Sequence, residues 1–220
     1  LPGPDPSVSA DATASRARVS LVQVRGRACG LVKQGTGWVV AGDLVVTNAH
    51  VVAGQRETQV LAADGRALAA QAVFVDGDAD VALMRVDGLG LPALPLGDAP
   101  STGDTVVLMG FPGGGGLTAE TVTASSPRTV LAPDAYGRGR QARSVVVTRG
   151  SLGPGSSGGP VLDRLGRVRA MIFGGSADGG SGAAVPPAPI RPGAPFRRQH
   201  CQEWSPGSQL VFGLSNWRIE

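Results

Sequence analysis

The segment Gly155-Ser156-Ser157-Gly158-Gly159-Pro160 is the stretch around which the other candidate residues of this chain are arranged. A serine between glycines suits a nucleophile, because glycine lets the backbone bend sharply and leaves room for a carbonyl to approach the N–H groups of Gly155 and Ser157. A serine hydroxyl is a weak nucleophile at neutral pH, so it needs a base within hydrogen-bond reach and a group that orients the base. In a chain with 34 glycines such a segment alone is more typical of a loop.

Two further residues supply the missing roles. His50, one of two histidines, lies in Thr47-Asn48-Ala49-His50-Val51-Val52, directly after the apolar run Leu44-Val45-Val46. Asp80 begins the apolar run Asp80-Val81-Ala82-Leu83. Each has an ordinary structural interpretation, since clustered aspartates usually lie in solvated turns. Together they follow the order His50, Asp80, Ser157, which is the order of the chymotrypsin architecture rather than of subtilisins or α/β-hydrolases. We therefore predict that these three residues form a catalytic triad.

These motifs resemble those of the trypsin-like serine proteases of the HtrA/Deg kind. A narrower resemblance, to the membrane-anchored periplasmic MarP-type proteases of actinobacteria, covers residues 18–182. It rests on the segments Ala28-Cys29-Gly30, Gly35-Thr36-Gly37-Trp38-Val39-Val40, Gly110-Phe111-Pro112-Gly113-Gly114-Gly115 and Ile172-Phe173-Gly174. The resemblance implies a serine endopeptidase that acts on proteins or peptides through an acyl-enzyme and needs no metal or organic cofactor.

The chemistry of the triad assigns a role to each residue. Ser157 would attack the carbonyl, His50 would accept and return the proton, and Asp80 would orient the imidazole. The N–H groups of Gly155 and Ser157 would form the oxyanion hole. Digestive trypsins have an aspartate at the position of Ser156 that pairs with a newly cleaved N-terminus, so we expect this chain to be active without N-terminal trimming.

Short apolar segments separated by Gly and Asp turns predict an all-β fold. We expect strands at 18–24, 35–40, 43–47, 58–61, 70–75, 81–85, 105–109, 117–123, 144–148, 160–162 and 168–173. The proline-containing segment 89–102 divides them into two groups of similar size. This agrees with the chymotrypsin-like double barrel of the resembled family, with six-stranded-type barrels at 18–97 and 98–182 and the active site in the cleft between them.

The two ends of the chain are expected to lie outside the barrels. Residues 1–17 are rich in Pro, Ser and Ala without periodicity, which predicts an extended linker. Residues 183–220 hold six of the 17 prolines and lose the alternation, so they are interpreted as an atypical tail that is either disordered or the product of a frameshift. The resembled family has a pocket-lining strand and a terminal helix there, and neither is legible.

Several other classes of function are disfavoured. The run Gly113-Gly114-Gly115-Gly116 is followed by no Lys-Ser/Thr pair, so we interpret it as a mobile loop beside the cleft and not as a phosphate loop. With a formal charge of +3 and no dense basic stripe, nucleic acid is not an expected partner. No apolar run approaches the roughly 20 residues that span a bilayer, so we expect this part of the protein to be soluble. We also expect it to be a monomer and to be attached to a membrane only through a segment that precedes it. The chain begins at Leu1, which indicates a fragment or a processed form of an extracytoplasmic protein.

The sequence gives less direct information on the substrate preference and on the pairing of the two cysteines. Ser151 stands near the expected base of the specificity pocket and carries no charge, which favours small or aliphatic side chains over Lys or Arg. The resembled family pairs a cysteine at the position of Cys29 with one near its C-terminus, so a Cys29–Cys201 disulfide is one interpretation and an accidental match is the other. Segment 125–143 is expected to be a long surface loop, which in the family helps to switch the oxyanion loop.

Two other functions remain open. A non-catalytic binding module on a protease scaffold is the alternative if the pocket strand is truly absent. An esterase or other acyl hydrolase would use the same triad.

Overall fold

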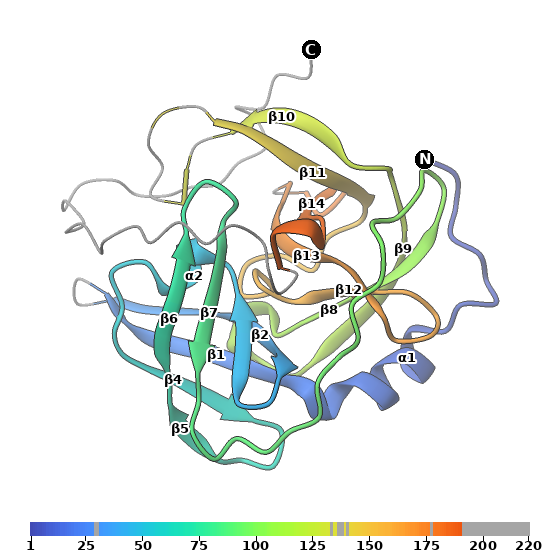
Figure 1. Cartoon of the computed structure of the whole chain (residues 1–220). Coiled ribbons are helices and arrows are strands. Elements are labelled where there is room, and N and C mark those ends of the chain that lie inside the picture. The colour runs from blue at the N-terminus through green and yellow to red at the C-terminus, as the bar shows by residue number, and fades with distance from the viewer. Residues whose placement is uncertain (29–30, 133, 136–138, 140, 177, 191–220) are drawn as a thin grey trace.

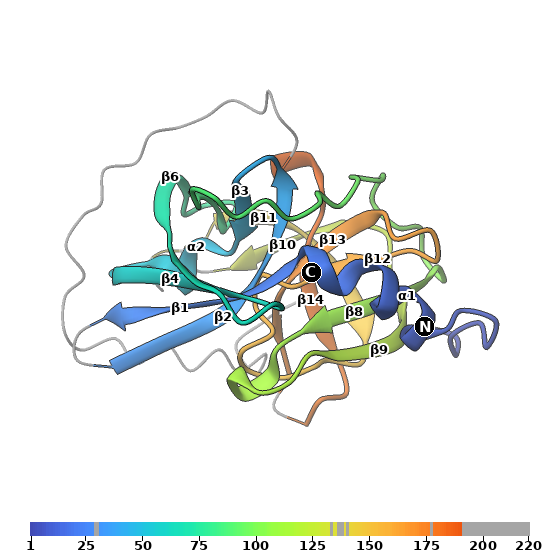
Figure 2. The same ribbon diagram turned by 90° about the horizontal axis from the view of Figure 1, so that it is seen from below.

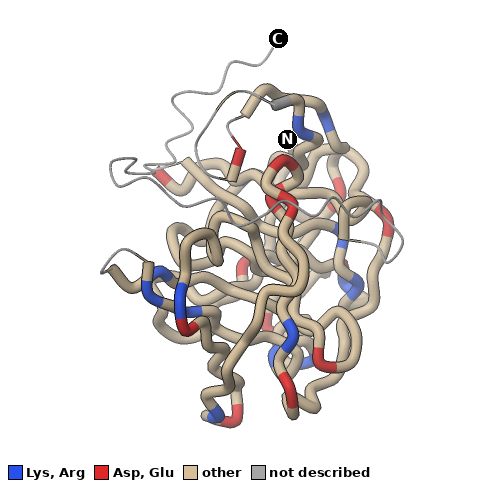
Figure 3. Tube along the Cα trace, turned by 60° about the vertical axis from the view of Figure 1, so that its left-hand side comes forward, with Lys and Arg blue, Asp and Glu red and all other residues tan. Residues whose placement is uncertain are grey.

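Two antiparallel sheets of seven strands each form the body of the protein, as Figure 1 shows. The computed structural model describes residues 1–190 except 29–30, 133, 136–138, 140 and 177. Each strand predicted from the sequence overlaps a strand of the structure, although residues 18–20 of the first one form a 3-10 helix. Basic and acidic residues are interspersed along the described trace (Figure 3).

The first sheet is built from the N-terminal half of the chain and has the order β5-β4-β1-β2-β3-β7-β6. It remains an open half-barrel with β5 and β6 at its edges. Its strands are β1 (Leu21–Ala28), β2 (Leu31–Ala41), β3 (Leu44–Thr47), β4 (Arg56–Ala62), β5 (Ala67–Ala69), β6 (Gln71–Asp76) and β7 (Val81–Arg85). The short helix α2 (Ala49–Val52) follows β3 directly.

The second sheet has the order β10-β11-β14-β13-β12-β8-β9, and an additional β11–β9 pairing closes six of its strands into a barrel. Strand β10 lies outside that ring, paired with β11. The strands are β8 (Thr105–Gly110), β9 (Thr118–Ala124), β10 (Arg128–Ala132), β11 (Gln141–Arg149), β12 (Pro160–Leu162), β13 (Val168–Gly175) and β14 (Gly182–Val185). The 3-10 helices are η1 (Arg18–Ser20), η2 (Pro112–Gly114) and η3 (Ala188–Ile190). The all-β, two-barrel prediction is therefore confirmed, with one barrel closed and one open.

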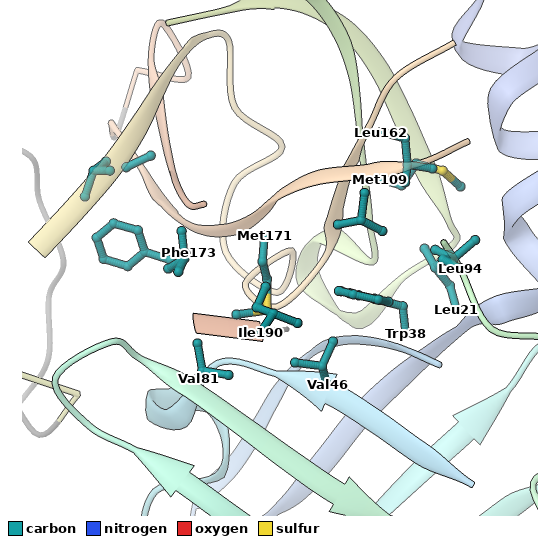
Figure 4. Close-up of a cluster of buried hydrophobic side chains, with 14 of the residues drawn as sticks. Leu21, Trp38, Val46, Val81, Leu94, Met109, Leu162, Met171, Phe173 and Ile190 are labelled. Atoms are coloured by element: carbon teal, nitrogen blue, oxygen red, sulfur yellow. The ribbon is translucent and has the colours of Figure 1, made fainter. Parts of the chain in front are cut away.

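A single apolar cluster joins the two barrels, as the close-up in Figure 4 shows. Trp38 and Val46 from the first sheet meet Met109 and Met171 from the second, and all four side chains are fully buried. The segment between the halves reinforces this contact, because Leu94 donates to Val39 O. The barrels are thus packed as one unit, which fixes the residues at their junction.

The ends of the chain differ from what the sequence predicted. Residues 10–17, expected within an extended linker, form helix α1 (Ala10–Ala17), which lies beside β8 and β9 (Figure 2). The side chain of Ser9 caps this helix by accepting a hydrogen bond from Ala12 N, and Asp11 stands in its first turn. Alanine has the highest helix propensity of any residue, so a lack of periodicity did not mean a lack of structure.

The boundary at residue 182 was also wrong. Strand β14 extends to Val185 and is inserted between β11 and β13, so it is an integral part of the closed barrel. Its residues are small and buried on both sides, which removes the alternation that a half-exposed strand would show. The apolar cluster continues to Ile190 in η3. The remainder of the predicted tail, 191–220, lies outside the described residues.

Candidate active site

His50 and Asp80 form a hydrogen-bonded pair at the end of the first barrel. Helix α2 carries His50, and the turn between β6 and β7 carries Asp80, whose side chain is buried. Asp80 Oδ2 lies 2.8 Å from His50 Nδ1, and Asp80 Oδ1 accepts a 2.9 Å bond from the backbone N–H of His50. Both carboxylate oxygens therefore engage one residue, which sets the position and the tilt of the imidazole ring.

The backbone at Asp80 is held in a conformation that most residues avoid. Its φ of +59° lies in the left-handed region, where an aspartate is tolerated better than a bulky side chain. Asn48 stabilises this conformation, because its Nδ2 donates a 2.9 Å bond to Asp80 O. Asn48 is itself fully buried and immediately precedes α2. The motif around His50 thus also positions the carboxylate.

Arg143 is a charged residue of the site that the sequence did not reveal. It lies on β11, inside the segment predicted as a surface loop, yet it is 5% exposed. Its Nε donates to Asp78 O at 2.8 Å and its Nη2 to Gly77 O at 3.3 Å. Its Nη1 is 3.9 Å from Asp80 Oδ2, and its guanidinium lies over the ring of Phe173, 5.3 Å from the centroid. The second barrel thereby holds the turn that carries Asp80.

The strand pair β10 and β11 explains why this arginine was missed. Segment 128–132 pairs with 141–145 in an antiparallel ladder, so both sides of the predicted loop are strands of the sheet. A strand is recognised in a sequence by alternating apolar and polar side chains, of which the polar ones face solvent. Arg143 is basic and yet buried, so it breaks this pattern. Pro133 and residues 136–138 and 140 of this segment lie outside the described residues, and the predicted role of the segment in switching the oxyanion loop stays a prediction.

Ser157 lies in a tight turn that leads into β12. Gly158 has a φ of +88°, and a Cβ there would come 2.1 Å from Thr36 O, so the position requires glycine for both reasons. Ser157 is partly exposed; its carbonyl accepts a 2.8 Å bond from Thr36 N, and its Oγ donates to Phe173 O at 3.4 Å.

Gly35 lies close both to the turn of Ser157 and to the helix that carries His50. A Cβ on Gly35 would meet the side chain of Val51, which follows His50, and Ser157 O at 3.0 Å. The turn of Ser157 and helix α2 therefore both lie close to one glycine of β2. The structure brings the three predicted triad residues to the junction between the barrels.

Two backbone N–H groups of the turn remain available for a ligand. Gly113 N donates a 2.8 Å bond to Pro154 O, which directs that carbonyl toward the glycine run. The peptide is trans, so the N–H of Gly155 points the opposite way. Within the described part of the chain, neither Gly155 N nor Ser157 N has a hydrogen-bond acceptor. The predicted oxyanion pair is therefore free of internal partners, and residues 113–114 lie beside it as a short 3-10 turn.

Ser151, predicted to stand near the base of a specificity pocket, lies beside two strands of the second barrel. Its side chain lies between Gly175, where a Cβ would meet Ser151 Oγ, and Gly182, where a Cβ would meet Ser151 Cβ at 3.6 Å. These glycines belong to β13 and β14, so the strand thought to be missing forms one side of this region. Cys29 and Cys201, the predicted disulfide, both lie outside the described residues.

Comparisons with known proteins agree with this geometry. A family model described as a trypsin-like peptidase domain matches residues 35–171, more than half of the chain. The chain belongs to the trypsin-like peptidase family. Serine protease Rv3671c of Mycobacterium tuberculosis is 37% identical over 179 residues, which are 80% of this chain and 45% of that protein. A probable periplasmic serine endoprotease, DegP-like, of Halomonas elongata is 35% identical over 137 residues, 61% of this chain and 28% of that protein.

A solved structure extends the likeness to the fold. The crystal structure of the active form of the Rv3671c protease from M. tuberculosis matches with a TM-score of 0.79 and 35% identity, covering 84% of this chain and 83% of that chain. The resemblance to trypsin-like proteases of the HtrA/Deg kind, and to the MarP-like group among them, is confirmed. The chain spans less than half the length of these two curated relatives. None of the helices in the described residues is long and apolar enough to span a bilayer.

Proposed function

We propose that this trypsin-like peptidase domain is a serine endopeptidase that cleaves protein or peptide bonds with His50, Asp80 and Ser157. The observation that carries the proposal is the 2.8 Å bond between His50 Nδ1 and Asp80 Oδ2 at the barrel junction, where the turn of Ser157 also lies. Asp80 holds Nδ1 in the protonated tautomer, which leaves Nε2 as the base. The binding-module alternative is not favoured, because it depended on the absence of the strand that β14 supplies.

The proposed cycle proceeds through an acyl-enzyme. Ser157 Oγ attacks the peptide carbonyl and its proton passes to His50 Nε2, while the oxyanion accepts hydrogen bonds from the N–H groups of Gly155 and Ser157. The C–N bond then breaks, and His50 protonates the leaving amine. Water attacks the resulting ester, gives a proton to His50, and the acid product leaves as the proton returns to Ser157 Oγ.

A fluorophosphonate probe tests the nucleophile directly, because it forms a covalent bond only with an activated serine. We expect labelling of the parent chain and none of Ser157→Ala, with His50→Ala strongly reduced. Thr123→Val, which alters a buried threonine of β9 away from the site, serves as the matched control and should label like the parent. A parent chain that does not label would refute the proposal. Paired peptide and ester substrates then separate a peptidase from an esterase.

The substrate side chain at the cleaved bond is proposed to be small or aliphatic. Ser151 lies between Gly175 and Gly182 and supplies no charge that would pair with Lys or Arg. A peptide panel that varies only this side chain should give the highest kcat/KM for Ala, Val or Leu. A preference for Lys or Arg would contradict this assignment.

The domain is proposed to work outside the cytoplasm, tethered to a membrane through a segment that precedes residue 1. The support is the relationship to a DegP-like protease named as probably periplasmic. Fractionation of the tagged full-length gene product, combined with protease accessibility in intact cells, tests both statements. A full-length product in the cytoplasmic fraction would contradict them.

A further inference from the structure

Thr36 is a fully buried residue of β2 in which every polar atom is used. Its N–H donates to Ser157 O at 2.8 Å, and its carbonyl accepts from Thr47 Oγ1 at 2.7 Å. Its hydroxyl donates to Gly155 O at 2.9 Å and accepts from Phe111 N at 3.0 Å. One residue of the first barrel therefore contacts both ends of the nucleophile turn.

The hydroxyl acts on the same loop that supplies the oxyanion N–H groups. It fixes the carbonyl of Gly155, whereas Gly113 N fixes the preceding carbonyl, that of Pro154. Two successive peptides are thus anchored on their carbonyl sides. Because a peptide is planar, rotation of either one would require both its carbonyl and its N–H to move. Gly113 thereby fixes the peptide that carries the N–H of Gly155, and Thr36 fixes the peptide that follows it. With both peptides held, rotation at Gly155 is restricted, and its N–H stays directed at the position where an oxyanion would form.

The partner of the hydroxyl on the other side strengthens this arrangement. Phe111 N belongs to the residue that precedes η2, the turn from which Gly113 donates. The hydroxyl thus links the glycine-run turn to the nucleophile turn, and both to β2. Since Thr36 belongs to the first barrel and its partners to the second, this link exists only when the barrels are docked.

We propose that Thr36 is a positioning residue for the oxyanion hole and that its hydroxyl acts through the hydrogen bonds to Gly155 O and Phe111 N. The inference rests on the proposed peptidase function and adds a residue on β2 of the first barrel to its machinery. Thr36 itself touches neither substrate nor the reacting atoms. Its contribution is made in the transition state, when negative charge develops on the carbonyl oxygen, so it should affect kcat more than KM.

Thr36→Val is the informative variant, because valine has nearly the shape of threonine and lacks both hydrogen bonds. It leaves Gly155 O and Phe111 N, which belong to partly buried residues, without the hydroxyl as a partner, and this loss favours a rearrangement of the loop. Thr36→Ser keeps the hydroxyl and is the conservative rescue. Thr36→Cys, with a weak S–H donor, gives a graded intermediate if the valine variant does not fold. Thr123→Val removes an equally buried hydroxyl, which bonds Pro2 O far from the turn.

The measurements are kcat and KM for a peptide substrate, the inhibition constant of a peptidyl trifluoromethyl ketone, and Tm. The ketone forms a hemiketal oxyanion with the serine, so its affinity reports on the oxyanion hole. We expect Thr36→Val to lose about 10- to 100-fold in kcat with KM within about threefold, below the 10²–10³ that follows removal of a whole donor. Its affinity for the ketone should fall in parallel, while Thr36→Ser and Thr123→Val stay near the parent.

Three outcomes would decide the question. A Thr36→Val or Thr36→Cys variant with parent-like kcat and ketone affinity but a lower Tm would overturn the inference and leave the peptidase function standing. An equal loss of kcat in Thr123→Val would overturn it as well, because the effect would then be general to buried threonines. A parent chain without turnover or labelling would instead refute the proposed function, on which the inference depends.

Discussion

Replacing Arg143 by methionine should destabilise the protein and disturb the site together. Methionine fills a similar volume and keeps a sulfur contact with the ring of Phe173, so the packing loss is small. The change nevertheless removes a buried cation 3.9 Å from Asp80 Oδ2 and leaves the carbonyl of Asp78 without its donor, while that of Gly77 keeps only Ala135 N. Breaking one partner of a buried pair costs about 3–5 kcal/mol, and we expect a loss in that range.

The assay is urea unfolding followed by far-UV circular dichroism, with the rate of fluorophosphonate labelling measured on the same samples. Arg149→Met is the matched control, because Arg149 lies on the same strand but is exposed and bonds only Leu1 O among the described residues. We expect the control to change the free energy of unfolding by less than about 0.5 kcal/mol. If Arg143→Met also costs less than about 1 kcal/mol and labels at the parent rate, the arginine does not hold the Asp80 turn.

Three further changes have definite expected results. Ser156→Ala removes a buried hydroxyl that has no hydrogen-bond partner among the described residues, so Tm should stay or rise and labelling should be unchanged; slower labelling would contradict this. Trp38→Ala should cost about 3–5 kcal/mol in urea unfolding, because it opens a cavity between the barrels, and a loss below 1 kcal/mol would mean that they do not depend on this cluster. Partial desolvation raises the pKa of Glu120, although the residue as a whole is exposed, and this favours its neutral form in the folded state. Stability from this group is therefore present at low pH and lost as pH rises through the raised pKa, so Glu120→Gln should raise Tm at pH 7 and less so near pH 4; an equal Tm at pH 7 would count against it.

The sequence predicted most strands because their side chains alternate or form short apolar runs. Strands such as β3 and β7 carry Val, Leu and Met beside turn residues, which is a strong local signal. The elements it missed lack that signal. Helix α1 is mostly alanine, serine and threonine, and β14 reads Gly-Ala-Ala-Val. The cap at Ser9, followed by Asp11, was a signal that could have located the helix.

The candidate triad was legible because its residues stand in motifs, whereas its supports act over long sequence separations. Arg143 contacts Asp78 across 65 positions, and Thr36 contacts Gly155 across 119. The local sequence around each of these two residues does not distinguish it from an ordinary strand residue. Their roles depend on how the two barrels dock, and no local pattern encodes that arrangement. Predicting them requires the tertiary structure.

The division of the site between the barrels has a consequence for the time before folding is complete. His50 and Asp80 belong to the first half of the chain and Ser157 to the second, so a half-synthesised chain would hold the proposed base without the proposed nucleophile. The anchoring bonds to Thr36 also form only once both halves have met. A peptidase built in this way would have no assembled triad before its barrels dock, so a newly made chain could not cleave its unfolded neighbours until it had folded itself.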